Sequence, residues 1–285
     1  MSVARIAELK EIVTAWHDRR QRIALVPTMG NLHRGHLALV EQAQRLAHRT
    51  VATLFVNPMQ FVAGEDLDRY PRTLEQDRAL LDAAGADVLF VPEVAALYPN
   101  GLDRHTEVRV PGLDTMLCGA SRPGHFTGVA TVVTKLLNLV RPDLAVFGEK
   151  DYQQLLVIKH MVADLCIEVE IHAVETMRAP NGLALSSRNA YLTEAERAIA
   201  WRLYEALCDA RDALSRAAPS FQAIQRRGRA RLEEAGFQAE YFVVRRASDL
   251  MEPAPEDSDL RILAAVWLGK TRLIDNLAAR TFVER

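Results

Sequence analysis

The sequence predicts an α/β fold in which a doubly wound parallel sheet is followed by a smaller α+β domain. Between residues 22 and 174, short and almost continuously apolar segments alternate with segments of helical periodicity. This alternation is typical of a parallel sheet that is covered by helices on both faces. After about residue 176 the order changes to helices followed by closely spaced strands. We therefore expect two domains, at residues 1–176 and 177–285.

The elements of the first domain follow from their apolar patterns. The segment RIALVPT at 22–28 is short, apolar and ended by a proline, as a buried strand is. The same pattern predicts strands at 50–57, 86–92, 144–150 and 167–174, with helices between them at 37–48, 74–85, 128–140 and 152–165. One face of the helix at 37–48 carries Leu37, Val40, Ala43 and Ala47. This order of strands and helices is Rossmann-like.

Two capping boxes mark helix starts. In a capping box, the side chains of a Thr and of a Glu or Gln three residues later accept hydrogen bonds from backbone N–H groups at the start of the helix. The pair Thr73 and Gln76 fits the helix that closes at Gly85, and Thr193 with Glu196 opens the second domain. A further helix is expected at about 222–235. The segments AEYFVVRRA, LRILAAVWLG and TRLIDNL then read as strands.

Composition restricts the class of protein. The net charge of −2 argues against a protein held to nucleic acid mainly by charge. No apolar run reaches the roughly 18 residues needed to cross a bilayer, and the N-terminal segment has no signal-peptide core. The three cysteines are far apart, as in a protein with reduced thiols. We expect a cytoplasmic protein without nucleic-acid or membrane partners.

The first strand is followed by PTMGNLHRGH, and ligands of parallel sheets bind where strands end. His33 and His36 lie one turn apart at the start of a helix, and Gly30 and Gly35 permit close backbone approach. A helix N-terminus and imidazole N–H groups suit phosphate and charge that develops on it. The alternative is that both histidines are local caps. The H-x-G-H pattern resembles the signature of the nucleotidyltransferase superfamily, and this resemblance implies adenylyl transfer from ATP.

Other polar residues follow the second and fourth strands. Asn57 and Gln60 can donate and accept hydrogen bonds, which suits a substrate with hydroxyl and carboxylate groups. The alternative is an Asn-Pro turn with a surface glutamine. Lys150 is placed to meet phosphate charge, unless it is an ordinary surface lysine. Asp151 either caps the next helix or binds ribose or metal, and Gln154 begins that helix.

Two loops complete the candidates. CGASRPGHFTGVA, with Arg122 and His125, is either a mobile wall over the site or a plain loop; whether these two side chains touch a nucleotide stays open. In LALSSRNAYL, the Ser186 and Ser187 hydroxyls with the Arg188 guanidinium suit a triphosphate, although helix capping explains the serines equally well.

Taken together, VPTMGNLHRGH, FVNPMQF, YPRTLEQD, SRPGHFTGVATVVTKLLNLVRPD, FGEKDYQQL and LALSSRNAYL resemble the pantothenate synthetase family of pantoate–β-alanine ligases. The resemblance runs through nearly the whole chain and implies a homodimer. It also implies that ATP, (R)-pantoate and β-alanine, with Mg²⁺, give pantothenate, AMP and pyrophosphate through pantoyl adenylate.

The same resemblance implies a role for each matching residue. His36 would be the acid-type catalytic histidine, with His33 and Lys150 on the phosphates. Gln60 would hold pantoate and β-alanine, and Gln154 would hold pantoate, with Asn57 beside them. The residues implied to bind ATP are Met29, Gly30, Asn31, Leu32, His33, Arg34, Gly35, His36, Gly148, Glu149, Lys150, Asp151, Met177, Leu185, Ser186, Ser187 and Arg188.

Three other functions are compatible with parts of this pattern. Another adenylyltransferase that makes a dinucleotide needs a phosphate-bearing acceptor, which the Gln60 and Gln154 amides suit less well. A tRNA synthetase needs a basic anticodon-binding module, and none follows in the sequence. A regulatory nucleotide-binding module would bind ATP without releasing AMP.

Overall fold

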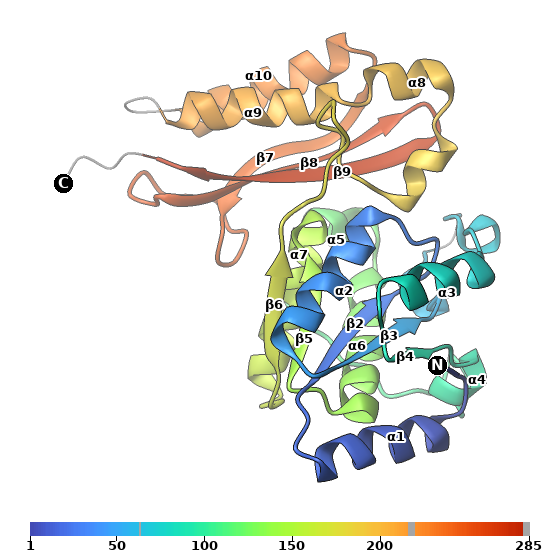
Figure 1. Ribbon diagram of the computed structural model, residues 1–285. Coiled ribbons are helices and arrows are strands. Elements are labelled where there is room, and N and C mark those ends of the chain that lie inside the picture. The colour runs from blue at the N-terminus through green and yellow to red at the C-terminus, as the bar shows by residue number, and fades with distance from the viewer. Residues whose placement is uncertain (63, 216–219, 282–285) are drawn as a thin grey trace. The chain divides into compact units, whose positions relative to one another are not determined.

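The computed structural model describes residues 1–62, 64–215 and 220–281 (Figure 1). The chain forms two compact units. The first comprises Met1–Glu149 and Gln154–Glu175, and the second comprises Lys150–Gln153 and Thr176–Arg285. The segment that follows the fourth predicted strand is thus divided between the units.

The first unit contains a six-stranded sheet in the order β1-β4-β3-β2-β5-β6, and every recorded pairing is parallel. The parallel sheet predicted from the sequence is therefore confirmed. Its strands are β1 (Ser2–Val3), β2 (Ile23–Thr28), β3 (Arg49–Leu54), β4 (Val88–Phe90), β5 (Leu144–Gly148) and β6 (Glu170–Val174). The edge strand β1, only two residues long, was not predicted.

The helices of the first unit flank this sheet (Figure 1). They are α1 (Ile6–Asp18), α2 (Arg34–Leu46), α3 (Leu74–Ala83), α4 (Val94–Leu97), α5 (Cys118–Ser121), α6 (His125–Val140) and α7 (Tyr152–Asp164). In β2, Ala24 and Val26 pack into one core with Leu39 and Val40 of α2. Ile23 and Leu25 alternate with them and are also fully buried. Because both faces of β2 are covered, its residues are apolar almost without interruption.

Helix α2 begins three residues earlier than predicted, at Arg34, and α6 begins at His125 rather than 128. The buried residues of α2 are Leu39, Val40 and Ala43. Of the other residues predicted on this face, Leu37 is half-buried, and Ala47 follows the helix as its C-cap. The apolar pattern located the helix, whereas its first turn is polar and carries no such signal.

The second unit contains an antiparallel sheet of β7 (Gln238–Arg246), β8 (Asp259–Leu268) and β9 (Thr271–Arg280). Three helices accompany it, namely α8 (Glu194–Ile199), α9 (Arg202–Leu214) and α10 (Phe221–Glu234). Leu260, Ile262 and Ala264 of β8 share one core with Leu207 of α9 and Leu232 of α10. The predicted capping box of Thr193 and Glu196 is present at the start of α8.

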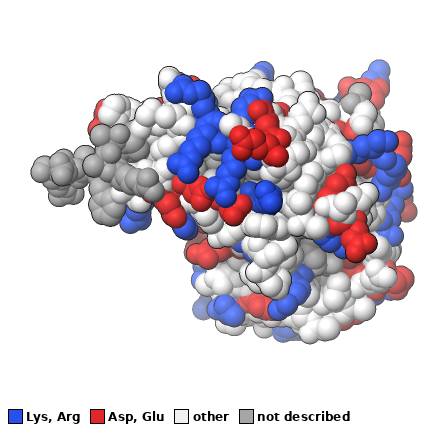
Figure 2. Space-filling model, turned by 90° about the horizontal axis from the view of Figure 1, so that it is seen from above, with Lys and Arg blue, Asp and Glu red and all other residues white. Residues whose placement is uncertain are grey.

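The surface of the second unit carries charges of both signs close together (Figure 2). On α9 and α10, Arg231 pairs with Glu205 and Asp209, and Arg229 pairs with Glu233. These ion pairs give the face a mixed charge, unlike the basic stripe of a typical nucleic-acid interface. Among the described residues, no helix has the length and apolar character needed to cross a membrane.

Candidate functional site

The turn after β2 has an unusual backbone. Gly30 and Asn31 both adopt left-handed conformations, with φ of 88° and 50°. A Cβ atom on Gly30 would lie 3.1 Å from an Asp77 carboxylate oxygen and 3.3 Å from the Leu54 side chain. Glycine is therefore required at position 30 both for its backbone conformation and for its lack of a side chain.

Asp77 of α3 holds this turn in place. Its carboxylate is 1% exposed and accepts hydrogen bonds from the backbone N–H groups of Asn31 (2.9 Å) and Leu32 (2.7 Å). The Thr73 hydroxyl donates to the same carboxylate at 3.1 Å. The Thr73 side chain makes no capping bond to the backbone, so the capping box predicted with Gln76 was wrong. Sequence reasoning missed Asp77, because its partners lie 45 and 46 residues away.

His33 and His36 form a reciprocal cap at the start of α2. His33 Nδ1 accepts from the backbone N–H of Gly35 at 3.1 Å, and His36 Nδ1 accepts from that of His33 at 3.2 Å. A backbone N–H can only donate, so the neutral form of each ring carries its proton on Nε2. The ring centroids are 4.1 Å apart. The turn therefore holds two adjacent imidazoles as Nε2–H donors.

This arrangement changes where an anion can be bound. The sequence led us to expect free backbone N–H groups at the start of α2. Instead, the Gly35 N–H donates to the His33 side chain. In the turn before the helix, the Asn31 and Leu32 N–H groups donate to the Asp77 carboxylate. The histidines are thus caps, as the alternative interpretation held, and their capping fixes the rings with Nε2–H as the donor. A phosphate at this turn would be met by imidazole donors more than by the backbone.

Gln60 is the last residue of the short 3-10 helix Pro58–Gln60, which follows β3, and Asn57 immediately precedes this helix. Both are buried, with exposed fractions of 1% and 7%. The Asn57 amide donates to Gln60 Oε1 at 3.2 Å, and Gln60 Nε2 donates to the Met29 sulfur at 2.8 Å. Met29 belongs to the turn that carries the two histidines, so the structure brings the predicted amide pair to that turn.

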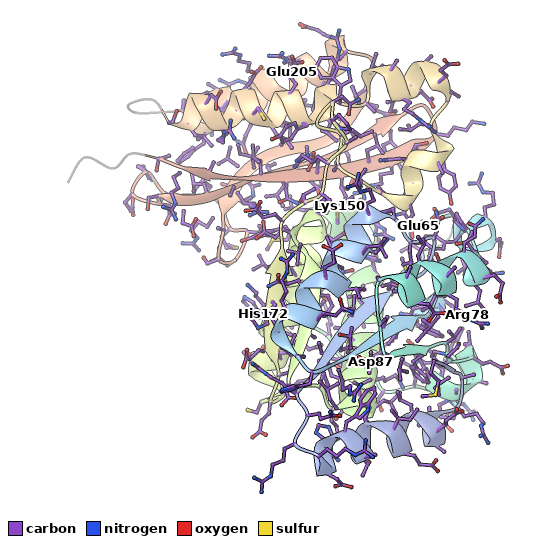
Figure 3. The ribbon with its side chains drawn as sticks, in the orientation of Figure 1. Glu65, Arg78, Asp87, Lys150, His172 and Glu205 are labelled. Carbon is purple, nitrogen blue, oxygen red and sulfur yellow. The ribbon has the colours of Figure 1, made fainter. Side chains whose placement is uncertain are left out.

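Arg122 and His125 support the same 3-10 helix. His125 Nδ1 lies 2.6 Å and Arg122 Nη2 lies 3.3 Å from the carbonyl oxygen of Gln60. Arg122 also pairs with Glu65, which is labelled in Figure 3. Burial raises the pKa of Glu65, but the hydrogen bond and charge of Arg122 outweigh burial, and the pKa lies below its ordinary value. One ion pair and the two contacts to the Gln60 carbonyl thus tie this loop to the 3-10 helix.

Helix α6 approaches the 3-10 helix Pro58–Gln60 at Gly128. A Cβ atom there would lie 2.2 Å from the carbonyl oxygen of Met59 and 2.8 Å from the backbone nitrogen of Gln60. The Gly128 carbonyl also accepts from the Asn57 amide at 3.1 Å. The position therefore admits no side chain while the helix and the loop keep their places.

We expect Gly128→Ala to destabilise the protein by about 1–3 kcal/mol, because the new methyl group must push one backbone segment away from another. The free energy of unfolding, measured by denaturant titration, checks this. The control is Thr127→Ala, one residue earlier on the same helix and half-buried, which should change stability much less. Equal stability of the Gly128 variant and the wild type would contradict the close packing.

Further candidates of the first unit lie at the end of β5 and just after it. Gly148 and Glu149 are half-buried, and a Cβ atom on Gly148 would meet only the Leu39 side chain, at 3.9 Å. Gln154 is half-buried in the first turn of α7.

Lys150, which is labelled in Figure 3, and Asp151 belong to the second unit, where Asn276 of β9 holds the Lys150 backbone. The Asn276 amide donates to the Lys150 carbonyl at 2.8 Å, and the Arg261 guanidinium donates to Asn276 Oδ1 at 2.6 Å. Lys150 Nζ lies 3.7 Å from the Asp151 carboxylate, and its side chain is 19% exposed. The lysine is thus more enclosed than an ordinary surface lysine.

A buried ion pair lies beside Asn276. Asp275 is 3% exposed and accepts two hydrogen bonds from Arg178, at 2.6 and 2.9 Å. The Arg178 guanidinium lies 3.8 Å from the centre of the Tyr204 ring. This planar, bidentate pairing fixes the segment that follows residue 176 to the sheet of the second unit.

That segment carries the last predicted residues. The Leu185 N–H donates to the Met177 carbonyl at 2.9 Å, and Met177 is 40% exposed. Ser186 Oγ accepts from the Arg188 N–H at 3.2 Å and caps the 3-10 helix Ser187–Tyr191. The capping interpretation of Ser186 is therefore confirmed, and Ser187 and Arg188 lie half-buried in the turn that it caps.

Among the described residues, no metal site made only of protein groups is found. The described part of the chain contains no group of three His, Cys, Asp or Glu residues that could hold an ion. Mg²⁺ commonly binds through substrate phosphates with one or two carboxylates, and that mode needs no such group.

Comparisons with known proteins agree over nearly the whole chain. The pattern of a family described as pantoate-beta-alanine ligase matches residues 1–278. The chain is 55% identical over 278 residues to a pantothenate synthetase of Chromohalobacter salexigens, covering 98% of each chain. It is 52% identical over 272 residues to one of Nitrosococcus oceani, covering 95% of each.

Solved structures extend this likeness to the fold. A pantothenate synthetase of Thermus thermophilus aligns with a TM-score of 0.90 and 46% identity, over 97% of this chain and 98% of that one. A pantoate-beta-alanine ligase of Francisella tularensis, complexed with beta-gamma ATP and beta-alanine, aligns with a TM-score of 0.81 and 34% identity over 97% of each.

Proposed function

The chain belongs to the pantoate-beta-alanine ligase family and is an enzyme that condenses pantoate with β-alanine at the expense of ATP, and we propose that it does so through pantoyl adenylate. The observation that carries the proposal is the bond from the Gln60 amide to Met29. It joins an amide that suits a carboxylate-hydroxyl acid to the turn whose imidazoles suit phosphate.

The reaction has two steps. In the first, a carboxylate oxygen of pantoate forms a bond to the α-phosphorus of ATP, and the bond to the β-phosphate oxygen breaks and releases pyrophosphate. In the second, the amine of β-alanine attacks the acyl carbon, the carbon–oxygen bond to phosphate breaks, and AMP leaves while the amine loses a proton. Activation is needed because a free carboxylate has no good leaving group.

His36 and His33 serve the first step. Their Nε2–H groups donate to phosphate oxygens and stabilise the charge that develops as pyrophosphate leaves. Since each Nδ1 is held by a backbone N–H, neither ring needs to turn before the reaction. Lys150 supplies positive charge to the same phosphates. Mg²⁺ held by the ATP phosphates would neutralise part of their charge.

Substrate binding completes the proposal. Gln60 holds pantoate and then β-alanine, Gln154 holds pantoate, and Asn57 supports Gln60. The second unit, together with the end of β5, contributes to ATP binding. The residues assigned to ATP are Met29–His36, Gly148–Asp151, Met177 and Leu185–Arg188. We further propose that the chain acts as a homodimer in the cytoplasm.

The proposal is tested by AMP release from ATP with pantoate and β-alanine omitted in turn, alongside pyrophosphate exchange into ATP with pantoate alone. We expect AMP release to need both substrates and exchange to need only pantoate. Exchange that requires β-alanine would rule out a free adenylate. ATP binding without AMP release would point to a regulatory module instead.

A further inference from the structure

Gln60 has a fixed orientation that follows from two backbone groups. Asn57 Oδ1 accepts from the Met59 N–H at 3.3 Å, and Asn57 Nδ2 donates to the Gly128 carbonyl at 3.1 Å. A backbone N–H only donates and a carbonyl only accepts, so the two ends of the Asn57 amide cannot be exchanged. The atom of Gln60 that faces Asn57 Nδ2 must then be its oxygen, and the Gln60 NH₂ group lies on the other side, toward Met29.

Tyr98 completes this arrangement. Its hydroxyl lies 2.8 Å from Asn57 Oδ1, to which it can only donate, and its side chain is 2% exposed. Burial raises the pKa of Tyr98 to about 12, so the hydroxyl keeps its proton at neutral pH. Two side chains lie beside the ring: His105 is edge-on at 5.2 Å, and Lys135 Nζ is 4.8 Å from its centre.

We propose that Tyr98 is a positioning residue. By donating to Asn57 Oδ1 it steadies the Asn57 amide, which makes Gln60 present its NH₂ group, and never its carbonyl, to the acid substrate. The inference rests on the proposed role of Gln60 in binding pantoate. It assigns the polarity of that contact: the substrate must offer oxygen acceptors, as a carboxylate or a hydroxyl lone pair does.

The backbone of this loop does not depend on Tyr98. His125 and Arg122 hold the Gln60 carbonyl from the other side. Loss of the Tyr98 hydroxyl therefore leaves the loop in place but removes one of the two donors to Asn57 Oδ1, so the Asn57 and Gln60 side chains are held less firmly. We therefore expect weaker pantoate binding, with little change in ATP binding.

The test is a double-mutant cycle of Tyr98→Phe with Gln60→Ala, read by the KM for pantoate and the KM for ATP. We expect Tyr98→Phe alone to raise the pantoate KM about tenfold, the scale of one buried hydrogen bond, and the ATP KM less than about twofold. In the Gln60→Ala background the same change should have no further effect. The control is Lys135→Met. Lys135 lies over the Tyr98 ring and does not contact its hydroxyl, so both KM values should stay normal.

A second variant keeps the proposal testable if Tyr98→Phe folds poorly. Gln60→Glu has nearly the shape of glutamine but offers oxygen on both sides, so we expect it to raise the pantoate KM at least as much as Gln60→Ala. A normal pantoate KM in Gln60→Glu, or an equal effect of Tyr98→Phe in both backgrounds, would overturn the positioning role. A normal pantoate KM in Gln60→Ala would instead remove Gln60 from the proposed site.

Discussion

Replacing His36 by alanine is expected to lower the rate of pyrophosphate exchange with pantoate by about 10²-fold or more, the usual scale for a lost charge-stabilising group. The His36 ring lies at the start of α2 with its proton on Nε2, where it can donate to a phosphate oxygen. The measurement is the exchange rate at saturating ATP and pantoate.

The alanine variant also removes part of a helix cap, so a second variant separates the two effects. His36→Gln keeps an acceptor for the His33 N–H, since glutamine is a usual partner in a capping box. We expect His36→Gln to be as stable as the wild type but to keep the low pyrophosphate exchange rate of His36→Ala. His160→Ala, at an exposed position on α7, is the matched control and should be fully active. Normal exchange in His36→Gln would show that His36 serves only the helix.

Replacing Lys150 by alanine is expected to lower kcat/KM for ATP by about 10²-fold, while the melting temperature changes by only a few degrees. The amine supplies charge to the phosphates, whereas the fold uses the Lys150 carbonyl, which any residue retains, to bond Asn276. Steady-state kinetics and a thermal melt together test this expectation.

Lys159→Ala provides the matched control, because Lys159 is an exposed lysine of α7. It should leave both measurements unchanged. If Lys150→Ala instead melts many degrees lower and binds ATP normally, Lys150 is a structural residue. Lys150→Arg retains the charge, and we expect its kcat/KM for ATP to lie between those of Lys150→Ala and the wild type.

Sequence patterns predicted the strands well and the polar contacts poorly. Strands β2 and β5 are almost continuous apolar runs because both faces of the sheet are buried there, and this property is local. The edge strand β6 contains Glu170 and His172 and has no fully buried residue. Helix α1 was not predicted, although the spacing of Leu9, Val13 and Trp16 held the signal. The start of α2 was placed too late, because its N-cap is a histidine and the usual cap residues are Ser, Thr, Asp and Asn.

The candidate site shows the same difference between local motifs and contacts that are distant in sequence. His33, His36 and Gln60 could be named because they follow strands in short motifs. Their supports could not: Tyr98 lies 41 residues from Asn57, and Gly128 lies 71 residues from it. These contacts arise only when β3, α4 and α6 come together, and no local spacing encodes them.

The link from Asp77 to the turn after β2 has a consequence for the time at which the turn is completed. The chain is made from its N-terminus, and Leu32 is synthesised 45 residues before the carboxylate that accepts its N–H. On the ribosome, the histidine turn therefore waits for α3 to emerge before its backbone donors are paired. A nascent chain released before residue 77 would contain both histidines in sequence but lack the group that sets the turn from which they project.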